Sequence, residues 1–280
     1  MVSQPLKIHG GKGAFNGKLA RWILSLFPPA DMYDNYVETN AGGLSVLLHR
    51  PADTVKAEIV NDLNGEIANF WYVMRDEFCF EKFRREVDTT PFARVVFEEA
   101  KTISTVDPIR QAWATFVKCR QSRQALGKDF ATLTKGRLRA GMNEQVSAWL
   151  SAVEGLDEVA ARLRGIVVEN CEASDLIRRM DALRTLFYVD PPYWGDERTS
   201  DGEYGEYEMD FAAHVRLLRS LVDLKGWFFL SGYRSPLYDL FAYENNWTRH
   251  DLPIVNNAAS GDTKKTKVEC VWTNWKASLI

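Results

Sequence analysis

The sequence is poor in the residues from which metal sites and disulfide frameworks are built. Its 280 residues include four histidines and four cysteines, which are scattered and form no C-x-x-C pair. Neither a zinc site nor a disulfide scaffold is therefore expected. No apolar run approaches the roughly 20 residues that a membrane span needs, and the first residues lack the basic-then-apolar pattern of a secretion signal. We expect a metal-free, cytoplasmic protein.

The sequence also lacks the uniform positive charge of a nucleic-acid coat protein, because its formal net charge is −3. Positive charge is concentrated between Arg110 and Arg139, where six further lysines and arginines are opposed only by Asp129. Such a cluster either captures phosphates or forms the solvated face of helices. The remaining composition, 46% hydrophobic and 26% charged, is typical of globular proteins.

Short runs of β-branched and aromatic residues alternate with helical patterns along most of the chain. Strands are expected at residues 36–38, 56–60, 166–169, 186–189, 227–230, 247–252 and 268–275. Helices are expected at residues 17–27, 45–49, 66–76, 174–180 and 211–223. This alternation predicts an α/β fold with a largely parallel sheet of about seven strands. Since only a polar loop separates the last two strands, one terminal strand should run antiparallel.

Between residues 78 and 163 the alternation stops and only helical patterns remain, at residues 80–87, 92–102, 108–120, 143–152 and 156–163. We interpret residues 78–163 as a helical lobe inserted into an α/β domain that is formed by residues 1–77 and 164–280. The glycine-rich, acidic stretch at residues 195–208 is either a lid or a plain surface connection.

The tetrapeptide Asp190-Pro191-Pro192-Tyr193 directly follows the apolar run 186–189. It therefore lies at the carboxyl end of a buried strand, where open α/β sheets bind their ligands. The two prolines have no N–H group, so the turn presents carbonyl acceptors. Asp190 adds a carboxylate and Tyr193 adds a flat ring. This set fits a planar heterocycle with an exocyclic amino group, although ordinary strand-ending turns use the same residue types.

Glycines and acidic residues follow the other predicted strands. After the first strand, Glu38 is followed by Asn40, Gly42 and Gly43, and such glycines let backbone approach a ligand closely. About 20 residues later, Asp62 ends the second strand, where an acidic residue can bind ribose hydroxyls. The same aspartate can instead cap the next helix.

Two further segments carry candidate ligand groups. Gly10-Gly11-Lys12 is cationic and outside any predicted helix, so it can contact a carboxylate or phosphate, or be a flexible tail. Glu172 follows the predicted strand 166–169 and can accept a hydrogen bond from an amino group, or be an exposed turn acid.

The order of these segments resembles that of the Dam-type adenine-specific DNA methyltransferases. The resemblance covers nearly the whole chain and rests on these segments in order: Gly10-Gly11-Lys12, Glu38 with Gly42-Gly43, Asn61-Asp62, the helical insertion, Asp190-Pro191-Pro192-Tyr193 and the closing strand 268–275. The turn after the first strand departs from the family's usual Glu-Pro-Phe-x-Gly-x-Gly. Asn40 stands where the family has an aromatic residue, and Leu44 replaces the last glycine.

The resemblance implies a Rossmann-like methyltransferase fold, S-adenosylmethionine as cofactor, and an adenine flipped out of double-stranded DNA as acceptor. It assigns catalysis to Asp190, Pro191, Pro192 and Tyr193. It assigns cofactor binding to Gly10, Gly11, Lys12, Glu38, Asn40, Gly42, Gly43, Asp62 and Glu172. DNA binding falls to the basic residues Arg120, Arg123, Lys128, Lys135, Arg137, Arg139, Lys264 and Lys265. An RNA adenine methyltransferase, a non-catalytic nucleic-acid-binding relative and a nucleotide-dependent oxidoreductase are the alternatives.

Overall fold

The computed structural model describes residues 4–8, 10–52, 54–131, 136–194, 207–255 and 266–276. Its helices are α1 Ala14–Leu26, α2 Ser45–His49, α3 Gly65–Arg75, α4 Glu77–Asp88, α5 Arg94–Thr102, α6 Pro108–Gln121, α7 Glu144–Glu154, α8 Leu156–Leu163, α9 Ala173–Met180, α10 Phe211–Val222 and α11 Pro236–Glu244. Short 3₁₀ turns are η1 Ala30–Met32 and η2 Arg123–Ala125. Its strands are β1 Asn35–Glu38, β2 Ala57–Asn61, β3 Leu138–Arg139, β4 Met142–Asn143, β5 Val167–Glu169, β6 Thr185–Val189, β7 Trp227–Tyr233, β8 Thr248–Val255 and β9 Thr266–Thr273.

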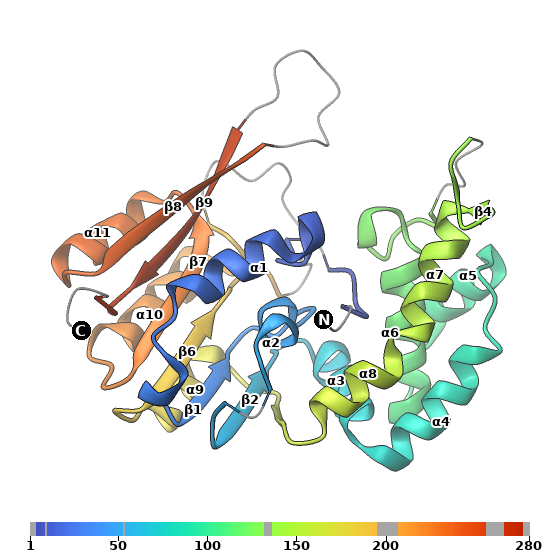
Figure 1. The fold of residues 1–280 in the computed structure, drawn as a ribbon, viewed down its shortest axis with the longest axis horizontal. Helices are drawn as coiled ribbons and strands as arrows, with labels where there is room; N and C mark the ends of the chain where they lie inside the picture. Colours follow the sequence, from blue (N-terminus) through green and yellow to red (C-terminus); the bar gives the residue numbers. More distant parts are fainter. Residues whose placement is uncertain are drawn as a thin grey trace. The chain divides into compact units, whose positions relative to one another are not determined.

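The fold is α/β, as predicted, with a seven-stranded sheet in the order β5-β2-β1-β6-β7-β9-β8 (Figure 1). Strands β2, β1, β6 and β7 pair in parallel. The last strand of the chain, β9, is antiparallel to both of its neighbours, β7 and β8. The expected antiparallel terminal strand is thus confirmed, and it is inserted between β7 and the edge strand β8.

The described residues form two compact units, each continuous in space but not in sequence. We call residues 26–40, 54–63 and 171–280 the sheet unit, and residues 1–25, 41–53 and 64–170 the helical unit. The predicted helical lobe, residues 78–163, falls within the helical unit. That unit also includes α2, α3 and β5.

Side chains of the sheet unit alternate between two faces, because successive residues of a strand point in opposite directions. One face is covered by α9, α10 and α11 through a buried cluster that includes Val37, Ile59, Leu176, Phe187, Leu217, Phe228 and Tyr238. On the opposite face, the Phe27 ring lies 6.0, 6.4 and 4.6 Å from the rings of Tyr36, Tyr188 and Phe229. Both faces of the central strands are therefore covered, which explains their uninterrupted apolar sequences.

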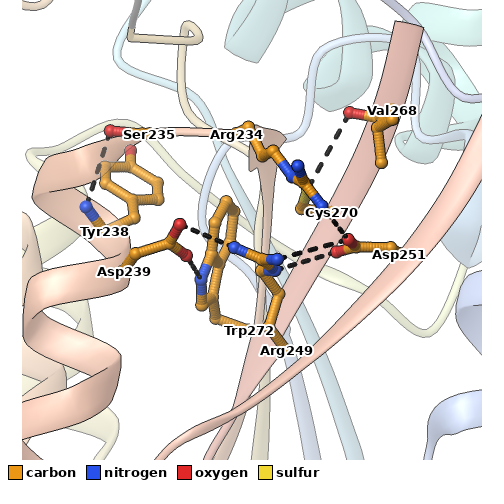
Figure 2. A network of polar contacts seen from close by, with 9 residues as sticks. All are labelled: Arg234, Ser235, Tyr238, Asp239, Arg249, Asp251, Val268, Cys270 and Trp272. Atoms are coloured by element: carbon orange, nitrogen blue, oxygen red, sulfur yellow. Dashed lines mark hydrogen bonds and ion pairs between the residues drawn. The ribbon is translucent and has the colours of Figure 1, made fainter.

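A polar network joins α11 to the hairpin of β8 and β9 (Figure 2). Asp239 of α11 accepts hydrogen bonds from the buried Trp272 indole at 3.0 Å and from Arg249 at 2.6 Å. Arg249 and Arg234 both contact Asp251. The indole N–H of a buried tryptophan needs such an acceptor, so Asp239 fixes the helix against the hairpin.

The helical unit has an aromatic core. Phe70 of α3 and Phe116 of α6 stack nearly parallel, with ring centroids 6.1 Å apart, and Phe83 of α4 packs edge-on against both. These three rings are fully buried. The predicted helices of the lobe are confirmed by α4 to α8. Side-chain oxygens accept from the first free N–H groups of several helices, namely those of Asn64, Asp76, Asp107 and Asn143.

Candidate functional site

The strand order of the sheet unit reverses between β1 and β6. These two strands are neighbours, but β1 also pairs with β2 and β6 also pairs with β7. The connection that follows β1 therefore leads toward one edge of the sheet and the connection that follows β6 leads toward the other edge. This creates the switch point where open α/β sheets bind ligands. Glu38 is the last residue of β1, and Asp190 directly follows β6. Both predicted site residues lie at the carboxyl ends of these strands.

The Asp190-Pro191-Pro192-Tyr193 turn leaves a strand in which all five residues are buried. Pro191 is buried as well, whereas Asp190 and Tyr193 are half-buried. The Tyr193 hydroxyl donates a hydrogen bond to the carboxylate of Glu269 on β9. The Tyr193 ring packs edge-on against Tyr233, with centroids 4.7 Å apart and an interplanar angle of 78°. The turn thus combines backbone acceptors with an aromatic ring that is held at two points.

Two tyrosines of the site are neutral donors at physiological pH. Burial raises the pKa of Tyr193 well above its usual value, and the nearby Asp190 and Glu269 carboxylates raise it further. Burial and then Asp190 have the same effect on the pKa of Tyr188, whose hydroxyl lies 3.0 Å from Ser231 Oγ. Neither phenol is therefore available as a general base. The acceptor groups of the site are carboxylates and carbonyls.

The residue after the turn is anchored from α10 and α11. The Trp194 ring lies 5.4 Å from the ring of His214. His214 is buried, and its Nδ1 is 2.8 Å from the Tyr238 hydroxyl. This aromatic support fixes the end of the turn on the helices of the sheet unit.

The other predicted site residues of the sheet unit differ in exposure. Glu38 is only 2% exposed and accepts a hydrogen bond of 2.6 Å from the Tyr36 hydroxyl. Asn40 and Asp62 are half-buried. Glu172 is exposed and directly precedes α9. The alternative that Asp62 caps the following helix is wrong, because Asn64 takes that position and accepts from Glu66 N–H.

Asn61, which the sequence analysis named only as part of the pair Asn61-Asp62 and gave no role, joins three segments at this edge of the sheet. Its side-chain amide donates to the carbonyls of Thr39 at 2.8 Å and Cys171 at 2.9 Å. Its Oδ1 accepts from the Cys171 N–H at 2.9 Å. Asn61 is 1% exposed, and its bond to the Thr39 carbonyl is fully buried. Asn61 therefore fixes the backbone immediately before Asn40, Asp62 and Glu172.

In the helical unit, the predicted Gly10-Gly11-Lys12 segment forms a turn and is not a free tail. The Gly11 N–H donates to the Ile8 carbonyl at 3.1 Å. The Lys12 side chain is buried, and its ammonium donates to the Gly10 carbonyl at 3.3 Å. The positive charge is thus held against the glycine backbone.

Gly11, Gly13 and Gly43 of the helical unit lie around the side-chain amide of Gln4. A Cβ at Gly43 would overlap Gln4 Nε2, and one at Gly13 would overlap Gln4 Oε1 and lie 3.3 Å from Ser45 Oγ. Among the described residues, neither Gln4 Nε2 nor Ser45 Oγ has a hydrogen-bond partner, although both atoms are buried. Buried polar groups are normally paired. Gly13 and Gly43 therefore make room for the Gln4 side chain.

The departure from the family turn at Leu44 has a conformational consequence. Leu44 has φ of +53° and precedes α2 in the left-handed conformation, which glycine adopts without cost. Its side chain is nevertheless fully buried. Gly42 also has a positive φ, and its carbonyl accepts from the Trp71 indole at 2.9 Å. Leu44 therefore adopts the left-handed backbone conformation that is typical of the glycine it replaces.

We expect Leu44→Gly to be more stable than Leu44→Ala. Both variants lose the buried leucine, but only glycine relieves the left-handed strain, which costs roughly 1–2 kcal/mol. Leu47 is fully buried inside α2. There we expect Leu47→Ala to be more stable than Leu47→Gly by about 0.5–1 kcal/mol, because glycine is unfavourable inside a helix. Urea denaturation of the four variants measures the difference. An alanine variant at position 44 that is more stable than the glycine variant would contradict the assignment.

The predicted DNA-binding residues are not all alike. Arg123, Lys128, Arg137 and Arg139 are exposed, with Arg139 in the β3–β4 hairpin. Arg120 instead points inward: it donates to the Gln4 carbonyl at 3.1 Å, and burial lowers its pKa to about 10. The residues Lys135, Lys264 and Lys265, and most of the stretch 195–208, lie outside the described residues.

Positive charges accumulate near the N-terminal segment of the helical unit. The pKa of Lys7 is lowered by burial and then by the positive charges of Arg120 and Arg139. Clustered positive charge of this kind attracts anions.

Comparison with known protein families gave no matching family model, and comparison with curated proteins gave no match. Among the residues that the structure describes, no three histidine, cysteine or acidic side chains are grouped as a metal site. In the same part of the chain, no helix has the length and apolar character to cross a bilayer.

Proposed function

We propose that the protein is a DNA adenine methyltransferase that transfers a methyl group from S-adenosylmethionine to the 6-amino group of an adenine flipped out of duplex DNA. The observation that carries this proposal is the position of Asp190-Pro191-Pro192-Tyr193 at the switch point of the sheet. The closing segment 268–275, on which the resemblance to Dam-type enzymes also rests, contributes the antiparallel strand β9.

Asp62 of the sheet unit is an acceptor that suits the donor this activity requires. In the sheet unit, Asp62 follows β2 and suits ribose hydroxyls. When bound, S-adenosylmethionine supplies an electrophilic methyl group on a sulfonium.

Asp190 and the Pro191 carbonyl are the acceptors for the target amino group. In adenine, the lone pair of this nitrogen is delocalised into the ring. Accepting its two N–H bonds favours a tetrahedral, more nucleophilic nitrogen, and it stabilises the positive charge that develops there during transfer. Methylation makes the remaining protons of the nitrogen acidic, and one of them then passes to the Asp190 carboxylate or to water.

Tyr193 provides the surface on which the base stacks. A base inside a duplex cannot reach the turn, and flipping it out costs a few kcal/mol. Stacking on an aromatic ring recovers about 1–3 kcal/mol per base. The ring therefore offsets much of the cost of removing the adenine from the helix.

The exposed arginines of the β3–β4 region are the candidates for contacts with DNA phosphates. We expect the double variant Arg137→Ala/Arg139→Ala to weaken duplex binding and to lower the slope of log K against log salt by about two, one for each lost contact. Fluorescence anisotropy at several salt concentrations measures both quantities. The double variant Arg85→Ala/Arg164→Ala removes the same charge from exposed positions on and after other helices. Equal effects of the two double variants would place the interface elsewhere.

Ligand binding tests the proposed function against its alternatives. Calorimetric titration should show saturable binding of S-adenosylmethionine and no binding of NAD(P). In a competition experiment, duplex DNA should displace structured RNA from the protein. Binding of NAD(P) alone would favour an oxidoreductase, in which the Asp190 turn has no role. Preference for structured RNA would indicate an RNA adenine methyltransferase. Binding of nucleic acid without binding of S-adenosylmethionine would indicate a non-catalytic nucleic-acid-binding protein.

A further inference from the structure

Glu269 lies at the candidate site because its strand is reversed. Strand β9 runs antiparallel to β7, with Tyr233 paired to Glu269 and Phe229 paired to Thr273. The beginning of β9 therefore lies beside the carboxyl end of β7. Its odd-numbered residues face away from the cluster that contains Cys270 and Trp272. Glu269 thus projects from the same face of the sheet as its pair partner Tyr233.

The Glu269 carboxylate is almost completely removed from water. It is 3% exposed, in a strand whose neighbouring side chains, Cys270 to Trp272, are fully buried. A buried carboxylate is unfavourable unless hydrogen bonds compensate for the lost hydration. A glutamine or an apolar residue would fill this position at lower cost, so packing alone gives no reason for an acid here.

The Tyr193 hydroxyl donates a hydrogen bond to the Glu269 carboxylate. Because burial and the surrounding carboxylates raise the pKa of Tyr193, the hydroxyl keeps its proton at neutral pH and can donate it to the Glu269 hydrogen bond. The Tyr233 ring contacts the Tyr193 ring edge-on at 4.7 Å. One contact fixes the tip of the ring and the other fixes its side, so the plane of Tyr193 is defined before any base arrives.

We propose that Glu269 is a positioning residue that holds the Tyr193 ring in the plane required to stack on the flipped base. This role rests on the proposed function, since it concerns the same base-binding turn. Glu269 touches Tyr193 and acts through it. Stacking needs a defined ring plane, and an ordered ring loses less conformational freedom when the base binds.

Four variants test the role: Glu269→Ala, Glu269→Gln, Tyr193→Phe and the double variant Tyr193→Phe/Glu269→Ala. Misplacement of a positioning group can cost about a hundredfold, so Glu269→Ala should lower kcat for transfer to unmethylated duplex DNA by about 10- to 100-fold. Its affinity for S-adenosylmethionine should be unchanged. Glu269→Gln keeps an acceptor oxygen and should stay within about threefold of the wild type.

The double variant separates positioning from general stability. Residues that act through one contact give non-additive losses, so Tyr193→Phe/Glu269→Ala should be no slower than Tyr193→Phe alone. NMR of tyrosine labelled at Cζ provides a readout that needs no turnover, because the Tyr193 resonance should move in Glu269→Ala and return toward its original position in Glu269→Gln.

Additive losses, an unchanged Tyr193 resonance or a wild-type kcat in Glu269→Ala would each overturn the positioning role while wild-type transfer still supported the proposed function. If the wild-type protein binds the donor but methylates no DNA, the proposed function fails and the positioning role fails with it.

Discussion

Replacing Asp190 with alanine should lower the rate of methyl transfer to duplex DNA by about a hundredfold to a thousandfold, which is the usual cost of removing a group that stabilises transition-state charge. Asp190 follows the buried strand β6 at the switch point and is half-buried. The variant loses the carboxylate acceptor and keeps the Pro191 carbonyl. Single-turnover transfer of labelled methyl measures the chemical step directly.

Donor affinity and the free energy of unfolding should change little in Asp190→Ala, because the segments that suit the donor lie elsewhere. Asp190→Asn should also be slow, since its amide presents one acceptor instead of two. Asp223 is an exposed aspartate at the end of α10 in the same unit, and Asp223→Ala is the matched control with wild-type rate expected. Retention of full activity by Asp190→Ala would exclude the mechanism.

Asn61→Ala should destabilise the protein by about 3–5 kcal/mol, because it removes three hydrogen bonds to backbone groups, and the loss of a buried partner costs roughly 1–3 kcal/mol. These groups are the carbonyl of Thr39 and both the N–H and the carbonyl of Cys171. The loss is large beside the 5–15 kcal/mol that stabilises a typical protein. Urea denaturation measures it.

Asn61→Asp separates hydrogen bonding from packing. It retains an acceptor for the Cys171 N–H but directs a carboxylate oxygen at two carbonyls, so it should be about as unstable as the alanine variant. Asn35 is half-buried and makes a hydrogen bond of 3.3 Å to Thr185 Oγ1 in the same unit, and Asn35→Ala should cost about 1 kcal/mol or less. Equal effects at Asn35 and Asn61 would show that Asn61 does not hold the sheet edge together.

The strands of the sheet could be predicted because burial on both faces leaves a plain apolar signal. Residues 186–189 are apolar throughout, and the structure buries the whole of β6. The ends of strands are harder to predict: the expected strand 227–230 continues in β7 through the polar Ser231 to Tyr233. The helix α11 was missed, although Ser235 caps it and Pro236 occupies its first position, which is a recognised start signal. The two-residue strands β3 and β4 are too short for any period to be visible.

The turn of the candidate site could be predicted from the sequence, but its supporting contacts could not. Asp190 and Glu38 follow apolar runs, so their place at the strand ends was visible. The contact of Tyr193 with Glu269 depends on the register of an antiparallel strand, which no local pattern specifies. The acid inside the apolar run 268–272 was the one available signal. The inward position of Arg120 was likewise hidden, because a charge pattern does not show which side of a helix is covered.

The most direct test of the proposed activity is transfer of labelled methyl from S-adenosylmethionine to unmethylated duplex DNA, followed by digestion and identification of the labelled nucleoside. We predict that the label appears in 6-methyladenine, in the wild-type protein and in Asp223→Ala but at a far lower rate in Asp190→Ala. Absence of label from DNA while the protein binds the donor, or label on cytosine instead of adenine, would contradict the proposed function.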